Sequence, residues 1–203
     1  LEAIREKIMA HVGAEMIVGG CRARECELGV LIADAMLESV KSQGVQIAIQ
    51  NGGGIRASLD TGEVTMGEIL TILPFQNTLS TFRVSGATLL AALENGVSQV
   101  EEGAGRFPQV AGLTYAFDPA GTVGKRVSDV RVLHSGRAVP LDPVKLYSVV
   151  SNNYLRNGGD GYKMFKTAQD VYDFGPDLAD IVAEYMAAHA PYQPYLAGRI
   201  IEK

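Results

Sequence analysis

Two spacings of apolar residues recur along the chain, and they predict most of its secondary structure. Apolar positions three or four residues apart, opposite a polar face, predict helices over residues 1–11, 27–40, 86–97 and 177–188. Thr65 followed by Glu68 is a capping-box pattern and predicts a further helix that begins at Met66. Short alternating or continuous apolar runs predict strands over residues 14–18, 45–49, 78–84, 109–117, 127–133, 145–150 and 198–201.

The order of these elements predicts the fold class. Helices and strands are interleaved irregularly, and several strands follow one another in the middle of the chain. This order favours an α+β fold, a mixed α/β sandwich with mixed sheets, over a doubly wound parallel sheet. The 203 residues contain no internal repeat, low-complexity tract or convincing linker, so they indicate a single domain with its own core.

Composition and charge narrow the class of partner. The 47% hydrophobic and 20% charged residues are typical of a soluble globular protein. The net charge of -5 argues against a nucleic-acid polymer as partner, although a few local arginines suffice for one small anion. No apolar stretch approaches the roughly 20 residues of a membrane span. No signal peptide is visible, and the start at Leu1, within a helix-like segment, suggests a fragment or a processed product.

The two cysteines, Cys21 and Cys26, lie five positions apart. Two cysteines without a histidine nearby cannot form a structural zinc site. They are either free thiols or a short-loop disulfide of the kind that persists in oxidising compartments.

A glycine-rich segment, Asn51-Gly-Gly-Gly-Ile-Arg56, follows a predicted strand directly. Its backbone amides and the Arg56 guanidinium would together suit an anion. The alternative is an ordinary glycine turn with a solvated arginine. The segment lacks the spacing of a phosphate loop or a dinucleotide fingerprint.

A second glycine-rich segment, residues 157–162, follows Asn153-Tyr154 and contains Asp160. Asp160 either caps a turn or accepts two hydrogen bonds from a ribose diol. Phe75 follows the proline that ends a predicted helix, and is either a core residue or an exposed platform for stacking a base.

A reaction centre is not visible in the sequence. His11, His134 and His189 are scattered, without the spacing of metal ligands or of a catalytic triad. The sequence therefore predicts recognition groups and neither a catalytic residue nor a metal or cofactor site in this chain.

Five motifs together resemble the C-terminal domain of the 5′-nucleotidase family, which includes UDP-sugar hydrolases. They are Cys-Arg-x-Arg-Glu-Cys, Asn-Gly-Gly-Gly-Ile-Arg, Leu-Pro-Phe, Gly-Arg-Phe-Pro-Gln-Val-x-Gly and Asn-Gly-Gly-Asp-Gly-Tyr. They occur in the family order, and the resemblance covers the chain from about Cys21 to its end.

The resemblance implies a role for each matching side chain in binding a nucleotide. Phe75 and Tyr154 match the aromatics that sandwich the base, and Tyr154 stands where some members have phenylalanine. Asp160 matches the acceptor of the ribose hydroxyls. Phosphate contacts and nearby polar contacts are implied for Arg22, Arg56, Asn51 and Asn153.

The resemblance also implies how the whole protein is organised. Residues 1–12 resemble the connecting helix between two domains, and residues 13–203 the substrate-recognition domain. A separate N-terminal metallophosphatase domain of the same polypeptide would hold two divalent metal ions and hydrolyse nucleoside 5′-monophosphates. The resemblance implies a Cys21–Cys26 disulfide and export to the periplasm or the cell exterior. The alternatives are a stand-alone nucleoside- or nucleotide-binding module without catalysis, and a domain whose glycine loops are only structural.

Overall fold

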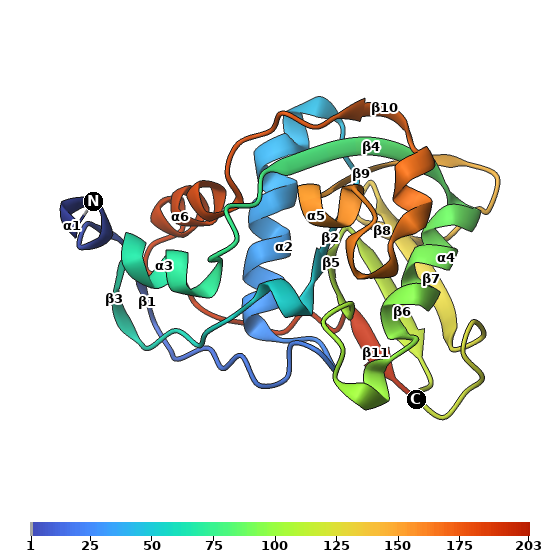
Figure 1. The fold of residues 1–203 in the computed structure, drawn as a ribbon, viewed down its shortest axis with the longest axis horizontal. Helices are drawn as coiled ribbons and strands as arrows, with labels where there is room; N and C mark the ends of the chain where they lie inside the picture. The colour runs from blue at the N-terminus through green and yellow to red at the C-terminus, as the bar shows by residue number, and fades with distance from the viewer. Residues whose placement is uncertain (1) are drawn as a thin grey trace.

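A five-stranded mixed sheet runs through the centre of the computed structural model, which describes residues 2–203 (Figure 1). Its strand order is β10-β4-β9-β2-β5, in which β2 and β9 are parallel and the other neighbours antiparallel. The bounds are β2 Ile47–Asn51, β4 Leu79–Ser85, β5 Pro108–Ala111, β9 Leu146–Asn152 and β10 Gln169–Tyr172. All five residues of β2 are buried, because both faces of the sheet are covered.

One face of this sheet is covered by two helices. They are α2 Glu27–Val40 and α6 Leu178–Ala188, with α2 between the sheet and α6 (Figure 1). The core on this side includes Ala48 and Val150, which point from neighbouring strands toward α2. A small sheet of β1 Ile8–Val12 and β3 Gly62–Thr65, with α1 Glu2–Arg5 and α3 Met66–Ile72, extends this side.

The other face packs against α4 and a second sheet. Helix α4 spans Gly86–Val97, and the four-stranded sheet has the order β11-β6-β7-β8. Its strands are β6 Leu113–Phe117, β7 Val127–His134, β8 Arg137–Pro140 and β11 Ile200–Glu202. Ile47, Ile49 and Val149 face this second core, because side chains alternate along a strand. The predicted single α+β domain with mixed sheets is confirmed.

The remaining elements are short helices near the ends of the central strands. Helix α5 spans Asn153–Arg156. The 3-10 helices are η1 Lys41–Gln43, η2 Gly52–Gly54, η3 Val100–Glu102, η4 Gly159–Gly161 and η5 Lys163–Thr167. Within residues 2–203, the structure contains no helix long and apolar enough to cross a membrane.

Several local predictions are confirmed. The helices predicted over residues 27–40 and 86–97 have these bounds in the structure, and the last helix begins one residue later than predicted. The capping box is present: the Thr65 hydroxyl accepts from the Glu68 amide at 3.2 Å, and the Glu68 carboxylate accepts from the Thr65 amide at 3.0 Å. These signals are local, so the sequence carries them directly.

The N-terminal predictions were wrong. The predicted helix over residues 1–11 is helical only at Glu2–Arg5, and its first residue, Leu1, lies outside the described residues. Ile8–Val12 is instead a strand, because it pairs with β3, and the alternation that buries Ala10 and Val12 replaces helical spacing. The strand predicted over residues 14–18 is reduced to one bridge between Met16 and Leu59.

One predicted strand is divided between the two sheets. Residues 109–117 separate into β5 and β6 at Gly112, whose φ is 74°. A β-carbon at Gly112 would lie 2.0 Å from the carbonyl oxygen of Gln46, so only glycine allows this close turn. The strands β3, β8 and β10 were not predicted, because each has only four residues, too few for a clear alternating pattern.

Candidate functional site

A cleft of about 670 Å³ opens where the parallel strands β2 and β9 end at the same edge of the sheet. Such an edge is a common ligand site, because the loops that follow the strands converge there. All seven predicted binding residues line it. The full lining consists of Arg22, Asn51, Gly53, Gly54, Arg56, Phe75, Asn77, Gly105, Asn153, Tyr154, Asn157 and Asp160.

Asp160 is the carboxylate of this cleft, and both of its oxygens have a partner in the chain. The Asn51 amide nitrogen donates to Oδ2 at 2.9 Å, and the Tyr154 hydroxyl donates to Oδ1 at 3.0 Å. A carboxylate has about four acceptor positions, so each oxygen can accept a further hydrogen bond from a ligand. Asp160 is therefore an oriented acceptor rather than the cap of an ordinary turn.

A chain of buried amides fixes the orientation of Asn51. The Asn152 amide nitrogen donates to Gln50 Oε1 and to Asn51 Oδ1, both at 2.9 Å. Asn51 Oδ1 therefore faces Asn152, which turns its amide nitrogen toward Asp160. Gln50 and Asn152 were not singled out from the sequence. The available signal was an uninterrupted apolar strand followed by amides, since buried polar side chains must be hydrogen-bonded.

The two predicted stacking residues are exposed aromatics. Phe75 is 55% exposed and Tyr154 is 47% exposed, so neither is a core residue. The hydrogen bond from Tyr154 to Asp160, with partial burial and the charge of that carboxylate, raises the pKa of Tyr154. The hydroxyl therefore stays protonated and keeps its role as donor.

The disulfide and the first glycine loop bring Arg22 to the cleft. Cys21 and Cys26 form the expected bridge, with 5.1 Å between their α-carbons. A β-carbon at Gly52 would lie 2.0 Å from the carbonyl oxygen of Cys21, so this glycine permits the disulfide loop to approach. The Arg22 guanidinium donates to the Gly103 carbonyl at 3.2 Å.

Arg56 is the second cation of the cleft. Its guanidinium carbon lies 5.8 Å from the centre of the Phe75 ring, within the range of a cation–π contact. Among residues 2–203, no carboxylate lies within 4.0 Å of the Arg22 or Arg56 guanidinium. Both cations are thus available to an anionic ligand.

The backbone amides of the first glycine loop do not share this availability. The amide of Gly52 donates to the Phe107 carbonyl at 2.8 Å, and that of Gly53 to the Gly105 carbonyl at 2.9 Å. The expectation that these amides help to hold an anion was therefore wrong. The glycines instead let two loops meet: a β-carbon at Gly53 would lie 2.6 Å from the α-carbon of Gly105.

The side-chain oxygen of Asn153 is used in a structural hydrogen bond, whereas its nitrogen, within the residues that the structure describes, is not. Its Oδ1 accepts from the backbone amide of Thr78 at 3.1 Å, which ties α5 to the start of β4. The amide nitrogen is the part that can donate into the cleft. In the part of the chain that the structure describes, no three His, Cys, Asp or Glu side chains are grouped so that they could hold a metal ion.

Comparison with known protein families identifies the family of this chain. The family model for the 5′-nucleotidase C-terminal domain matches residues 7–167 of the chain. The chain belongs to the 5′-nucleotidase C-terminal domain family. This confirms the resemblance that the five motifs indicated.

Relatives of this 5′-nucleotidase C-terminal domain occur in bacteria and animals. The trifunctional nucleotide phosphoesterase protein YfkN of Bacillus subtilis is 41% identical over 184 residues, which are 89% of this chain and 13% of that protein. The 5′-nucleotidase of Homo sapiens is 34% identical over 194 residues, 89% of this chain and 34% of that protein. The chain thus spans well under half of these relatives.

A solved structure extends the similarity to three dimensions. The crystal structure of the 5′-nucleotidase precursor from Thermus thermophilus is 43% identical, with a TM-score of 0.96. The alignment covers 99% of this chain and 40% of that one. Nearly the whole of this chain therefore has the same fold as the matching part of that protein.

Proposed function

We propose that this chain is the nucleotide-recognition domain of a metal-dependent 5′-nucleotidase. The base would stack between Phe75 and Tyr154, the ribose hydroxyls would bind Asp160, and the phosphate would lie beside Arg22 and Arg56. The convergence of two half-exposed aromatics, one oriented carboxylate and two available arginines in one cleft carries this proposal. The volume of about 670 Å³ is typical of sites for small molecules of this size.

The side chains of the cleft match the chemistry of the three parts of a nucleotide. An exposed aromatic face offers a base roughly 1–3 kcal/mol of stacking. A carboxylate with two free acceptor positions suits a pair of neighbouring hydroxyls. Arginine suits phosphate, because its planar group of donors matches the phosphate oxygens. Asn51 and Asn153 would supply further polar contacts to the ligand or to its bound water.

The proposal includes a division of labour between domains. An N-terminal metallophosphatase domain of the same polypeptide would hold two divalent metal ions, which activate water for attack on the phosphate. The residues of the present chain bind the base and ribose and orient the phosphate. Residues 1–12, with α1 and β1, would connect the domains. We also propose export to the periplasm or cell exterior, which the disulfide supports.

The test uses the complete natural polypeptide that contains this chain. Hydrolysis of adenosine 5′-monophosphate is measured with added divalent metal, for the natural protein and for Arg56→Ala. Loss of a charge-assisted hydrogen bond is expected to raise KM by about 10-fold or more. The control is Arg131→Ala, because Arg131 lies on β7 and pairs with Asp129. Equal KM values for Arg56→Ala and the natural protein would contradict the proposal.

A second measurement tests the division of labour. We expect the 203-residue chain alone to bind adenosine with a dissociation constant near the millimolar range, about -4 kcal/mol, in a calorimetric or NMR titration. We expect it to show no phosphatase activity. Metal-dependent turnover by this chain alone would overturn the proposed division, and binding without turnover by the complete polypeptide would favour a stand-alone binding module.

A further inference from the structure

Asp160 owes its position to an uncommon backbone conformation. Its φ and ψ are 54° and 30°, in the left-handed region that residues other than glycine rarely occupy. Gly158 and Gly161, on either side, also have positive φ values of 91° and 79°. A loop of this kind persists only where surrounding contacts hold it.

Asn95, near the end of α4, supplies such a contact. Its amide nitrogen donates to the backbone carbonyl of Asp160 at 3.0 Å. A β-carbon at Gly161 would lie 2.5 Å from Asn95 Oδ1, so the loop packs directly against this side chain. Asn95 therefore touches the loop at the two consecutive residues that have positive φ.

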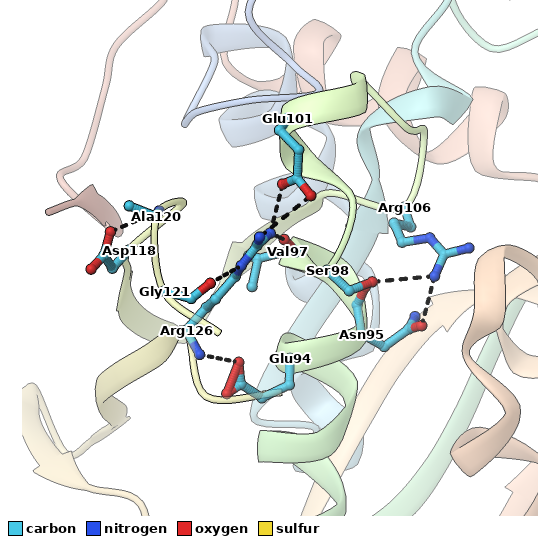
Figure 2. Close-up of polar contacts among 10 residues, drawn as sticks. All are labelled: Glu94, Asn95, Val97, Ser98, Glu101, Arg106, Asp118, Ala120, Gly121 and Arg126. Atoms are coloured by element: carbon cyan, nitrogen blue, oxygen red, sulfur yellow. Dashed lines mark hydrogen bonds and ion pairs between the residues drawn. The ribbon is translucent and has the colours of Figure 1, made fainter. Parts of the chain in front are cut away.

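Arg106 determines which end of the Asn95 amide faces Asp160. The Arg106 guanidinium donates to Asn95 Oδ1 at 3.1 Å and to the Ser98 hydroxyl at 3.3 Å (Figure 2). Because a guanidinium can only donate, the oxygen of Asn95 must face Arg106 and its nitrogen must face Asp160. Among the described residues, no carboxylate pairs with Arg106 within 4.0 Å.

The end of α4 is itself anchored on its other side. Figure 2 shows Arg126 reaching the carbonyl of Val97, at 2.9 Å, and the carboxylate of Glu101, at 2.7 Å. The Glu94 carboxylate accepts from the backbone amide of Arg126 at 2.8 Å. This part of α4 is thus fixed to the start of β7, and it presents Asn95 to the loop as a rigid support.

We propose that Asn95 and Arg106 are positioning residues for ribose recognition through Asp160, an inference that rests on the proposed function. Neither side chain is part of the cleft lining found among residues 2–203. They act from behind the loop: Arg106 orients the Asn95 amide, and Asn95 holds Asp160 in the conformation in which Asn51 and Tyr154 reach its carboxylate. Their removal should impair selection for the ribose hydroxyls more than binding of base or phosphate.

The experiment compares two substrates of the complete polypeptide. The ratio of kcat/KM for adenosine 5′-monophosphate to kcat/KM for its 2′,3′-dideoxy analogue measures recognition of the hydroxyl pair. Asn95→Asp retains an acceptor for Arg106 but replaces the donor to the Asp160 carbonyl by a carboxylate oxygen. We expect this variant to reduce the ratio by about 10-fold or more. Arg106→Met, which cannot orient the amide, should reduce it in the same direction.

Ser85→Ala is the matched control, because Ser85 caps the opposite end of α4, where its hydroxyl accepts from the Thr88 amide at 3.1 Å. This variant should lower the melting temperature and leave the ratio unchanged. An equal fall of the ratio in Ser85→Ala would attribute the effect to general destabilisation of α4 and overturn the proposal.

Asp160→Asn separates this inference from the proposed function. If Asp160→Asn lowers the ratio while folded Asn95→Asp and Arg106→Met keep it, the positioning role is wrong and the proposed function stands. If Asp160→Asn leaves the ratio unchanged, the ribose contact of the proposed function is itself wrong. If an Asn95 variant does not fold, the Arg106→Met ratio decides the question.

Discussion

Replacing Phe75 by alanine separates binding from folding, because this ring lies at the surface of the cleft. Truncating a fully buried phenylalanine costs about 3–5 kcal/mol of stability. Phe75 keeps 55% of its surface exposed in the folded chain, so the expected loss is less than half of that, about 1–2 kcal/mol. The variant should therefore fold and have a moderately lower melting temperature.

The same substitution is also expected to weaken the binding of a nucleotide. One face of the stacked base would lose roughly 1–3 kcal/mol, which corresponds to about a 5- to 150-fold weaker affinity. The contact of Arg56 with the ring at 5.8 Å is lost as well, which leaves that arginine less well placed for phosphate. A calorimetric titration with adenosine and with adenosine 5′-monophosphate measures both effects.

Phe174→Ala is the control for this experiment. Phe174 is also an exposed aromatic, 84% accessible, and it contacts Tyr172 rather than the cleft. Its truncation should change neither titration. If Phe75→Ala bound adenosine as tightly as the natural chain, stacking on this ring would be excluded, and the base would have to lie elsewhere.

Three further outcomes are expected. Replacing both Cys21 and Cys26 by serine should lower the free energy of unfolding by about 2 kcal/mol, as expected for a disulfide that closes a short loop. It should also weaken nucleotide affinity, because this loop carries Arg22 of the cleft. An unchanged melting temperature and an unchanged nucleotide titration would contradict this. Arg126→Met should lower the free energy of unfolding in urea by about 2–4 kcal/mol, since the buried Arg126 guanidinium donates to two backbone carbonyls and to a carboxylate. A loss below about 1 kcal/mol would show that these bonds are dispensable for stability. Burial raises the pKa of Tyr115 and Tyr162 above the ordinary value of 10. Their contribution to the free energy of unfolding is therefore fully present below pH 10 and falls as the pH rises beyond it, by up to about 1.4 kcal/mol per pH unit for each residue. Urea unfolding between about pH 9 and 11 that showed no decline would refute this assignment.

Local signals in the sequence predicted the parts of the fold that depend on neighbouring residues. Helices α2 and α4 were predicted with correct bounds, because helical spacing and capping involve residues only three or four positions apart. The seven cleft residues were identified within or beside short sequence motifs, and the structure brings all of them together. Their roles in binding a nucleotide stay predictions.

Long-range pairing decided what the local pattern could not. Ile8–Val12 has the apolar spacing of a helix, yet it is a strand because β3, about fifty residues later, offers backbone partners. Residues 109–117 look like one strand, yet they divide at Gly112 because the Gln46 carbonyl occupies the space that a side chain would need. A contact between distant segments leaves no periodic signal in either of them.

The sequence by itself therefore determined the class of fold, the family and seven of the twelve residues that line the cleft, because each of these depends on short patterns of residue types. Only the tertiary structure decided how the cleft is supported. Asn95 reaches the Asp160 carbonyl from a segment that is distant in sequence, and Arg106 orients Asn95. Asn152 orients Asn51 from a neighbouring strand. Such support depends on the direction of individual hydrogen bonds, which exists only after the sheets and α4 have packed.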